Sequence, residues 1–406
     1  MSHLRNKTVS VIGLGYIGLP TAALLASQGF KVLGMDVSQH AVDTINRGEI
    51  HIVEADLDAY VRSAVSQGML TAHTEVRPAD VYMICVPTPF RSCEDIPTPN
   101  IDYVKEAAIS ISPHIKAGDI VILESTSPVG TTDLIRDVLT QQGVNVDEIH
   151  IAYCPERVLP GKIMIELVQN DRVIGGVNVE STVAVAEFYR TFVRGDILET
   201  EARTAEMCKL TENSFRDVNI AFANELSMIC DSNGVDVWEL IKLANHHPRV
   251  DILLPGTGVG GHCIAVDPWF IVSADPKNAK LIKQARQVND VKPNWVADKI
   301  IERAKKTGKD SPKIACLGLA FKPDIDDLRE SPAIDVVKAL MASNVNVLCV
   351  EPNITDHSYF SISSFEDALR DADVIAILVG HEEFRSQVNR DLLRNAEAMD
   401  FCGVIA

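Results

Sequence analysis

A cysteine within a glycine-rich stretch is the residue of this sequence best suited to covalent chemistry. The segment 256–267 reads Gly-Thr-Gly-Val-Gly-Gly-His-Cys-Ile-Ala-Val-Asp and places Cys263 four residues before Asp267. Glycines allow positive φ and a close approach of the backbone to a ligand. A thiol that faces backbone N–H groups or the start of a helix has a lowered pKa and more thiolate. Cys263 is therefore interpreted as a nucleophile; a buried apolar cysteine in a tight packing turn is the alternative.

Polar residues on a predicted long helix are suited to stabilising a developing charge. Between Ala205 and Cys230, apolar residues recur every three or four positions, which predicts a helix. Lys209 and Asn213 lie one turn apart and share a face, and Arg216 is close to the same face. An ammonium and an amide on one face can hold an oxyanion or a water. A solvated polar face is the alternative interpretation.

The start of the chain carries a dinucleotide fingerprint. The apolar run 8–12 precedes Gly13-Leu-Gly15-Tyr16-Ile17-Gly18, and a helical stretch and a second strand, 31–35, then end at Asp36. This is GxGxxG in its strand–turn–helix context, with an acid at the expected distance. The glycines let a pyrophosphate approach the helix N-terminus, and Asp36 is expected to bind ribose hydroxyls and repel a 2′-phosphate. The sequence thus predicts NAD rather than NADP; an ordinary turn with a surface aspartate is the alternative.

Two later predicted strands end in loops that contain hydroxyl groups. The strand at 80–86 precedes Thr88, and the strand at 119–124 precedes Thr126. A cofactor lies at the carboxyl edge of a parallel sheet, so both threonines are predicted to bind the cofactor or a catalytic water. Helix N-capping is the alternative for each.

Another predicted strand, 149–153, leads into a loop that contains Glu156, Arg157 and Val158. An acid and a base between two prolines suit sugar recognition, although by composition alone the loop is only a rigid turn. A further strand at 171–175 and a helix at 181–192 complete an N-terminal domain.

Beyond residue 300 the pattern becomes α/β again. Apolar runs at 346–350 and 373–379 follow a strand that starts at Lys313, but GxGxxG is missing, so a second dinucleotide is not expected here in the usual manner. Lys322 and Arg329 are predicted phosphate partners, or else simple surface residues. The predicted fold class is α/β: an NAD-binding Rossmann domain at 1–198, a central helical region with the cysteine loop at 199–300, and a Rossmann-like domain at 301–406.

Composition excludes several classes of function. The chain has 406 residues and a net charge of -18, which argues against nucleic acid and against a basic membrane face. No run approaches the length of a transmembrane helix. The 9 cysteines form no CxxC pairs, which indicates a reducing compartment and hence the cytoplasm. No metal is expected, because His246, His247, His262 and Cys263 fit none of the usual zinc spacings.

Taken together, these motifs resemble the UDP-glucose/GDP-mannose dehydrogenase family from end to end. The resemblance rests on Gly13–Gly18 with Asp36, Val86–Pro89, Ser125-Thr126, Pro155-Glu156, Lys209 with Asn213, Gly260–Cys263 with Asp267, and Phe321-Lys322 with Arg329–Pro332. Three further segments resemble the branch of the family that oxidises UDP-N-acetyl-D-mannosamine: Cys154–Gly161, His247-Pro-Arg249 and Cys263–Phe270. One departure is Pro160, where UDP-glucose dehydrogenases carry a second glutamate.

The resemblance implies a four-electron oxidation of C6 from alcohol to carboxylate, with two NAD used in succession and with Cys263 forming a thiohemiacetal and then a thioester. It implies that the product feeds bacterial surface polysaccharides. It also implies that the enzyme is a homodimer with its dimerisation region at 199–300, and that the domain at 301–406 binds the UDP-sugar. The implied catalytic residues are Cys263, Lys209, Asn213, Asp267, Thr126 and Glu156. The implied NAD contacts are Gly13, Gly15, Tyr16, Ile17, Gly18, Asp36, Thr88, Thr126 and Arg329. The implied UDP-sugar contacts are Arg157, Val158, Lys209, Asn213, Arg216, His247, Arg249, Gly260, Phe321 and Lys322.

Several alternatives stay open at this point. The same chemistry on UDP-N-acetylglucosamine or UDP-glucose is the first. A two-electron hydroxyacid or sugar-phosphate dehydrogenase, which needs no cysteine, is the second, and a non-enzymatic binding protein for NAD or a nucleotide-sugar is the third. The residues alone also leave open whether Lys209, Asp267 or Glu156 is the base in each half of the reaction.

Overall fold

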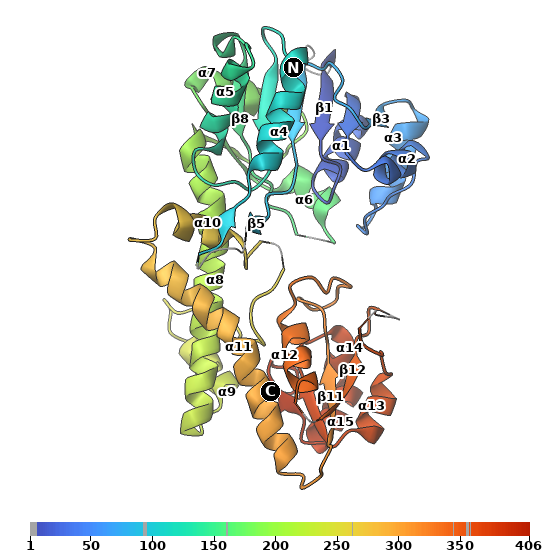
Figure 1. Cartoon of the computed structure of the whole chain (residues 1–406), viewed down its shortest axis with the longest axis vertical. Coiled ribbons are helices and arrows are strands. Elements are labelled where there is room, and N and C mark those ends of the chain that lie inside the picture. The colour runs from blue at the N-terminus through green and yellow to red at the C-terminus, as the bar shows by residue number, and fades with distance from the viewer. Residues whose placement is uncertain are drawn as a thin grey trace. The chain divides into compact units, whose positions relative to one another are not determined.

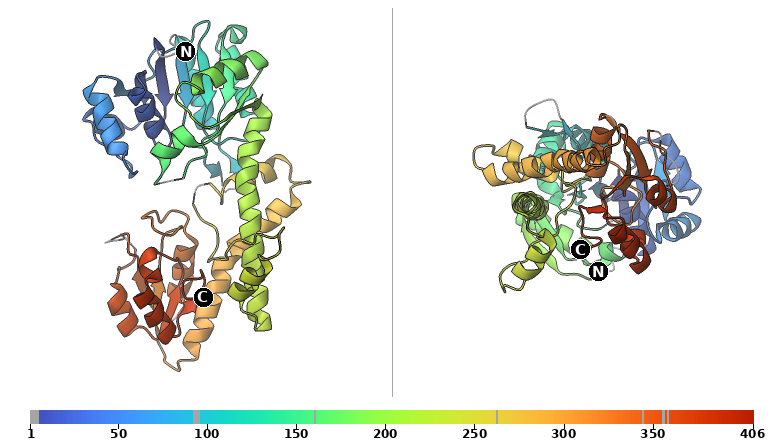
Figure 2. Two further views of the ribbon diagram at one scale, coloured as in Figure 1. Left: turned by 180° about the vertical axis from the view of Figure 1, so that it is seen from behind. Right: turned by 90° about the horizontal axis from the view of Figure 1, so that it is seen from below.

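The structure, a computed structural model, describes residues 6–91, 96–159, 161–261, 263–343, 345–354, 357 and 359–406. The chain divides into two compact units, Met1–Thr211 and Glu212–Ala406. Figures 1 and 2 draw the helices and strands of each unit. Pro160 and His262, two positions considered from the sequence, lie outside the described residues.

A mostly parallel sheet is the frame of the first unit. Its strands within the described residues are β1 (Thr8–Ile12), β2 (Lys31–Met35), β3 (Leu70–His73), β4 (Val81–Ile84), β7 (Ile120–Leu123), β8 (His150–Tyr153), β9 (Arg172–Gly176) and β10 (Ile197–Glu201). Their order is β10-β9-β8-β7-β4-β1-β2-β3, and only β8 and β9 pair antiparallel. The predicted strands 8–12 and 31–35 match β1 and β2, so the fold class and the position of the dinucleotide turn are confirmed.

Helices cover both faces of this sheet (Figures 1 and 2), because its central strands are apolar on both sides. One core packs the sheet against α1 (Gly18–Ser27), α2 (Gln39–Asn46), α3 (Leu57–Ser66), α6 (Ile163–Gln169) and α7 (Val179–Tyr189). A second core packs the other face against α4 (Asp102–Ile111) and α5 (Thr131–Gln141). A short hairpin, β5 (Phe90–Arg91) with β6 (Thr98–Pro99), lies outside the sheet.

The strand order reverses between β1 and β4. The chain runs from β1 outward through β2 to β3 and then returns to place β4 on the other side of β1. Ligands of open α/β sheets bind at such a switch point, outside the carboxyl ends of the strands. The segments that leave β1 and β4 at this point are Gly13–Gly18 and Cys85–Thr88.

In the described residues between β10 and the second sheet, the chain forms four helices. They are α8 (Ala202–Asn233), α9 (Val237–Ala244), α10 (Asp267–Ala274) and α11 (Lys280–Lys305). The helix predicted between Ala205 and Cys230 is therefore confirmed and is longer at both ends. The last of the four, α11, continues through Pro293.

The second sheet is smaller and parallel. Its strands within the described residues are β11 (Lys313–Leu317), β12 (Asn346–Val350), β13 (Val374–Ile377) and β14 (Met399–Asp400), in the order β12-β11-β13-β14. One face packs against α11 and α12 (Pro332–Met341). The other face packs against α13 (Phe365–Asp371), α14 (Glu382–Arg385) and α15 (Gln387–Asn395).

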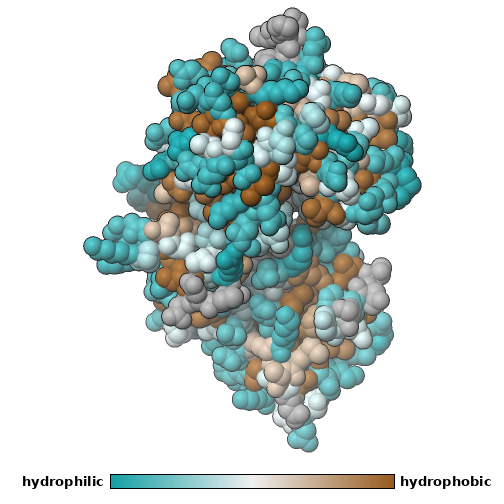
Figure 3. All heavy atoms as spheres, turned by 45° about the horizontal axis from the view of Figure 1, so that its top comes forward, coloured by the Kyte–Doolittle hydropathy of each residue, from teal (hydrophilic) through white to brown (hydrophobic). Residues whose placement is uncertain are grey.

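Among the described residues, no helix is both long enough and apolar enough to cross a bilayer. The face drawn in Figure 3 carries mostly hydrophilic residues, with apolar residues scattered between them.

Candidate active site

The three glycines after β1 have separate roles. Gly13 has a φ of 90°. A Cβ added to Gly18 would lie 1.8 Å from the carbonyl oxygen of Gly13, so α1 can pack this close to the turn only with glycine there. A Cβ added to Gly15 would meet no protein atom within 4 Å. Gly15 therefore borders open space, which is what close approach of a pyrophosphate requires.

The start of α1 is available for an anion. Ile17 is its N-cap, no side chain caps it, and its first turn contains no acidic residue. Backbone N–H groups at such an end attract phosphate. Tyr16, which is 41% exposed, borders the same turn.

Asp36 lies at the end of β2 and fixes the turn. Its Oδ2 accepts the Leu14 N–H at 2.9 Å, and its Oδ1 accepts the Ser38 N–H at 2.9 Å. Each carboxylate oxygen has two lone pairs, and the residue is only half-buried. Asp36 can therefore hold the turn and still accept hydrogen bonds from a ribose.

Thr88 and Thr126 are brought together at the carboxyl edge of the first sheet. The Thr88 hydroxyl donates to the carbonyl oxygen of Thr126 at 2.5 Å. The alternative of N-capping fails for both, because α5 starts after Gly130 and α4 starts after Ile101. The Glu206 carboxylate, which accepts the Gly130 N–H at 2.6 Å, satisfies the start of α5 instead.

Glu156 is buried and tied on both oxygens. Its Oε2 accepts from Nη1 of the buried Arg172 at 2.7 Å, and its Oε1 accepts the Arg157 N–H at 2.6 Å. The Arg157 guanidinium reaches the carbonyl oxygen of Asp171 at 3.2 Å, and Val158 packs against the first core. In this geometry the glutamate anchors the loop that carries Arg157 and Val158.

Cys263 is exposed, so the alternative of a buried core cysteine is wrong. Its carbonyl oxygen accepts the Asp267 N–H at 2.8 Å, which places the cysteine one turn before α10. Asp267 is buried, and its Oδ2 accepts from Nδ2 of Asn213 at 2.5 Å. The cysteine, the aspartate and the α8 amide therefore form one group. Lys209 lies one turn before Asn213 on α8 and is also buried, which excludes a solvated polar face for these two residues.

The glycines before Cys263 allow the loop to pack tightly. A Cβ on Gly260 would lie 2.2 Å from the Glu330 carbonyl oxygen, and a Cβ on Gly261 would lie 2.7 Å from the Phe321 ring. Phe321 therefore touches the cysteine loop directly. Gly256, at the start of the loop, donates its N–H to Oδ1 of Asn224 at 2.9 Å.

Asn224 belongs to a buried polar network that holds the beginning of the cysteine loop. Its Nδ2 donates to Oδ1 of Asn289 at 2.9 Å, and Asn289 in turn donates to Oδ1 of Asp217 at 2.8 Å. Arg286 completes the network with an ion pair of 2.6 Å to Asp217. Sequence reasoning missed this network, although asparagines within long apolar helices are a signal that could have found it.

The loop after β11 carries Phe321 and Lys322 and is also fixed by buried groups. Glu351 accepts the N–H groups of Leu319 and Ala320 at 2.7 and 3.0 Å. His381, which is buried, lies 3.0 Å from Glu351 through Nε2 and accepts the Asp324 N–H at 2.9 Å through Nδ1. Hydrogen bonds from His381 and Leu319 outweigh the effect of burial and lower the pKa of Glu351.

The remaining predicted contacts are exposed. Arg216, His247 and Arg249 point to solvent, and the Arg249 N–H lies 3.3 Å from Nδ1 of His247. Lys322 is exposed as well. Arg329 forms an ion pair of 2.6 Å with Asp327, so a phosphate partner role requires Arg329 to share or leave that carboxylate.

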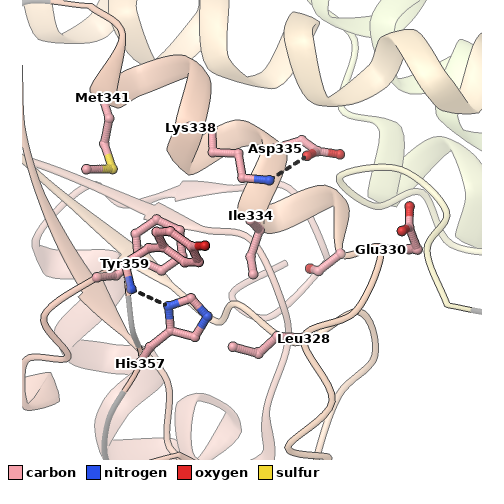
Figure 4. A pocket seen from close by; sticks show the side chains of 10 residues that line it. Leu328, Glu330, Ile334, Asp335, Lys338, Met341, His357 and Tyr359 are labelled. Atoms are coloured by element: carbon pink, nitrogen blue, oxygen red, sulfur yellow. Dashed lines mark hydrogen bonds and ion pairs between the residues drawn. The ribbon is translucent and has the colours of Figure 1, made fainter.

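A pocket of about 580 Å³ beside α12 is not suited to a diphosphate. Figure 4 shows its lining, which includes Glu330 and Asp335. Its one lysine, Lys338, already pairs with Asp335 at 3.9 Å. Two carboxylates against a single paired ammonium repel a dianion, so the nucleotide-sugar is expected elsewhere.

Comparison with known proteins covers nearly the whole chain. The family models described as the NAD-binding, central and UDP-binding domains of the UDP-glucose/GDP-mannose dehydrogenase family match residues 7–193, 203–291 and 315–406. An NDP-N-acetyl-D-galactosaminuronic acid dehydrogenase of Ralstonia nicotianae is 54% identical over 98% of this chain and 96% of its own length. A UDP-N-acetyl-D-mannosamine dehydrogenase of Yersinia pestis is 54% identical over 95% of this chain and 96% of its own length.

The structural comparison agrees. The solved UDP-D-ManNAc dehydrogenase of Pyrococcus horikoshii has a TM-score of 0.90 and 37% identity, and the match covers 98% of this chain and 96% of the other. The dinucleotide turn, the exposed cysteine with its aspartate, and the second sheet thus occur in a chain that matches the family throughout. The chain belongs to the UDP-glucose/GDP-mannose dehydrogenase family and carries its NAD-binding, central and UDP-binding domains.

Proposed function

We propose that this chain oxidises C6 of UDP-N-acetyl-D-mannosamine to a carboxylate, with Cys263 as the nucleophile. Family membership makes it an NAD-dependent UDP-sugar dehydrogenase; the particular sugar and the covalent route are the proposal. The observation that supports the route most is the exposed Cys263 one turn before Asp267, whose carboxylate is held by Asn213. An exposed thiol with a fixed carboxylate and an amide nearby suits acyl chemistry better than packing.

The chemistry that NAD would supply when bound is acceptance of the hydride that leaves C6 in each half-reaction. In the first, the C6 hydroxyl proton passes to Lys209 or to a water held by Asp267 and Thr126, which leaves an aldehyde. The Cys263 thiolate then forms a C–S bond to the aldehyde carbon. Lys209 and Asn213 are assigned to stabilise the oxygen of the resulting thiohemiacetal.

The second half-reaction removes the remaining C6 hydride and leaves a thioester on Cys263. Water attacks the thioester carbon, the C–S bond breaks, and the thiolate leaves as the carboxylate forms. Because Arg172 and the Arg157 N–H occupy both oxygens of Glu156, we assign the activation of this water to Asp267. Glu156 is assigned to hold the loop of Arg157 and Val158.

Replacing the nucleophile tests the covalent route. Cys263→Ser is expected to lower uronate formation by roughly a thousandfold or more, because a serine hydroxyl is far less acidic than a thiol. The measurements are the uronate formed and the NADH produced per sugar, with two NADH expected for the wild type. Cys402→Ser, a half-buried thiol of the same unit, is the control and should keep both values. Uronate formation by Cys263→Ser at the wild-type rate would overturn the route, and one NADH per sugar would indicate a two-electron dehydrogenase.

The sugar has a second candidate. The Ralstonia and Yersinia relatives are equally identical to this chain, and their names point to N-acetylgalactosamine and N-acetylmannosamine derivatives. N-acetylgalactosamine, which differs from N-acetylmannosamine at C2 and C4, was not considered from the sequence. A panel of UDP-ManNAc, UDP-GalNAc, UDP-GlcNAc and UDP-glucose with NAD or NADP decides between them; the largest kcat/KM is expected for UDP-ManNAc with NAD.

The remaining roles are proposed from the family resemblance. The division at residues 198 and 300, the cytoplasmic location and the supply of uronate to bacterial surface polysaccharides belong here. The NAD contacts proposed are Gly13, Gly15, Tyr16, Ile17, Gly18, Asp36, Thr88, Thr126 and Arg329. The UDP-sugar contacts proposed are Arg157, Val158, Lys209, Asn213, Arg216, His247, Arg249, Gly260, Phe321 and Lys322.

We also propose that two copies of this chain associate through α8. Phe215, Phe222 and Ile229 recur every seven residues and are 67%, 54% and 49% exposed. Residues seven apart lie on one face of a helix, so they form an apolar stripe that a second α8 can cover.

A further inference from the structure

A buried carboxyl lies at the carboxyl edge of the first sheet, and the mechanism above does not use it. Glu124 directly follows β7 and is 2% exposed. Its Oε1 accepts from the phenol of Tyr189 on α7 at 2.5 Å. Its Oε2 accepts from the thiol of Cys85, which follows β4, at 3.2 Å. Buried carboxyls are rare unless they are paired, so this residue requires a physical reason.

The groups around Glu124 do not balance its charge. Those that act on it electrostatically or by hydrogen bond are Cys85, Glu156, Arg172 and Tyr189, and Cys154 is close enough to feel its charge. Arg172 is the one cation among them, and it already pairs with Glu156 at 2.7 Å. If Glu124 were ionised as well, the cluster would hold one uncompensated negative charge in a buried site, which is costly.

A proton on Glu124 removes that excess charge. Burial and the charge of Glu156 raise the pKa of Glu124 to about 7, although Arg172 opposes them. The protonated carboxyl can donate to Tyr189 or Cys85, because a phenol and a thiol also accept hydrogen bonds. The cluster is then neutral as a whole and keeps its hydrogen bonds to Tyr189 on α7 and to Cys85 after β4.

Those links lead to the NAD site. A Cβ on Gly13 would lie 2.8 Å from the Cys85 carbonyl oxygen, and a Cβ on Gly18 would lie 3.2 Å from Cβ of Cys85. Cys85 therefore packs directly against the dinucleotide turn. The residue after Glu124, Ser125, donates to the carbonyl oxygen of Val86 at 2.6 Å and so joins the ends of β7 and β4.

We propose that Glu124, in its protonated form, is a positioning residue that holds the Cys85 and Glu156 loops in the arrangement that binds NAD. When Glu124 loses its proton, repulsion between the two carboxylates loosens these loops and weakens cofactor binding. The inference rests on the NAD-binding role of the first domain and does not depend on Cys263. Glu124 does not touch the reacting atoms; it acts through Cys85, Tyr189 and the Glu156–Arg172 pair.

The sign of the pH dependence follows directly. The form that binds NAD carries the proton, so binding above the pKa of Glu124 requires proton uptake. The Kd for NAD of the wild type should therefore rise with pH above about 7, by up to about tenfold per pH unit, the limit for one proton. Glu124→Gln keeps the shape and the neutral state, so its Kd should stay nearly constant over the same range.

NAD titrations between pH 6 and 9 test this, by calorimetry or fluorescence, on the full chain without the sugar. Asp119→Asn is the matched control: Asp119 is a buried carboxyl that immediately precedes the same strand, β7, and accepts the Lys116 N–H. It should keep the wild-type pH dependence. An equal rise in Kd for Glu124→Gln and the wild type would overturn the proposal, whatever the outcome for Cys263.

A second variant, Tyr189→Phe, tests the proposal independently in case Glu124→Gln has a folding defect. The Tyr189 hydrogen bond lowers the pKa of Glu124, so Tyr189→Phe should raise that pKa and move the rise in Kd to higher pH. The infrared carbonyl band of a protonated carboxyl, identified by its loss in Glu124→Gln, should titrate with the same midpoint as the Kd. A band that titrates elsewhere, or a midpoint that moves to lower pH in Tyr189→Phe, would also overturn the proposal.

Discussion

Two glycines of the dinucleotide turn are needed for different reasons. A Cβ on Gly18 would overlap the backbone oxygen of Gly13 at 1.8 Å, and a backbone atom cannot turn away as a side chain can. A Cβ on Gly15 would meet no protein atom within 4 Å. The fold therefore requires glycine at position 18, whereas at position 15 the reason for glycine is the proposed close approach of NAD.

Alanine at these two positions should separate folding from binding. Gly18→Ala is expected to lower the free energy of unfolding by about 1–3 kcal/mol or more, as overpacking does. Gly15→Ala should change it by no more than about 0.5 kcal/mol, as is usual for surface substitutions, yet weaken NAD binding roughly tenfold or more. Urea denaturation and NAD titration measure the two effects. If Gly15→Ala destabilises the fold as strongly as Gly18→Ala, the open space at position 15 is wrongly assigned.

The two sheets share one arrangement after their first two strands: a glycine with positive φ after the first strand, and an acid after the next strand that fixes the turn. Gly13 after β1 and Gly318 after β11 have φ values of 90° and 89°, and an acid after the next strand accepts the N–H of the following residue. In the first sheet that acid, Asp36, is half-buried and can still reach a ribose. In the second sheet Glu351 is buried. The carboxylate that corresponds to the ribose-binding acid of the first sheet is therefore inaccessible to a ribose in the second sheet. This agrees with the lack of GxGxxG in the second sheet.

The buried acid of the second sheet instead fixes the loop of Phe321 and Lys322. Removing its partner with His381→Ala leaves Glu351 without its imidazole and frees the Asp324 N–H. The expected result is a KM for the UDP-sugar about tenfold higher with a smaller change in kcat, because the role proposed for this loop is in binding the UDP-sugar and not in the chemical steps. Steady-state kinetics measure both. His357→Ala, an imidazole of the same unit, should leave KM unchanged; an equal effect in the two variants would rule out a specific role for His381.

At the level of elements, the sequence predicted those helices and strands that are encoded by local patterns of apolar residues. Apolar, β-branched runs predicted the bounds of β1 and β2, and apolar residues that recur every three or four positions predicted α8. Each of these patterns could be recognised because it is made of residues only a few positions apart in the sequence. The partners of Glu156 and Asp267 could not be predicted in this way. Arg172 is 16 residues from Glu156 and Asn213 is 54 from Asp267. Such pairs depend on which strands and helices become neighbours, and single-residue patterns do not encode that.

At the level of the whole molecule, the residues proposed for the reaction belong to two compact units. The NAD-binding turn belongs to Met1–Thr211, and the cysteine loop with the UDP-binding domain belongs to Glu212–Ala406. The division falls within α8, between Lys209 and Asn213. The two α8 residues that are proposed above to stabilise the thiohemiacetal oxygen, Lys209 and Asn213, therefore lie on opposite sides of this division.

The same helix leads to a prediction about assembly. Phe222 is at the middle of the exposed stripe with Phe215 and Ile229, and burying such rings is a large part of what stabilises helix–helix interfaces. Phe222→Glu places a charge at the centre of the stripe and should convert a dimer into a monomer at micromolar concentration, as measured by sedimentation equilibrium. Val291→Glu introduces the same charge at an exposed apolar residue of α11 and should remain dimeric. A Phe222→Glu protein that stays dimeric would place the interface on another face. A monomeric wild type would show that no second copy covers the stripe.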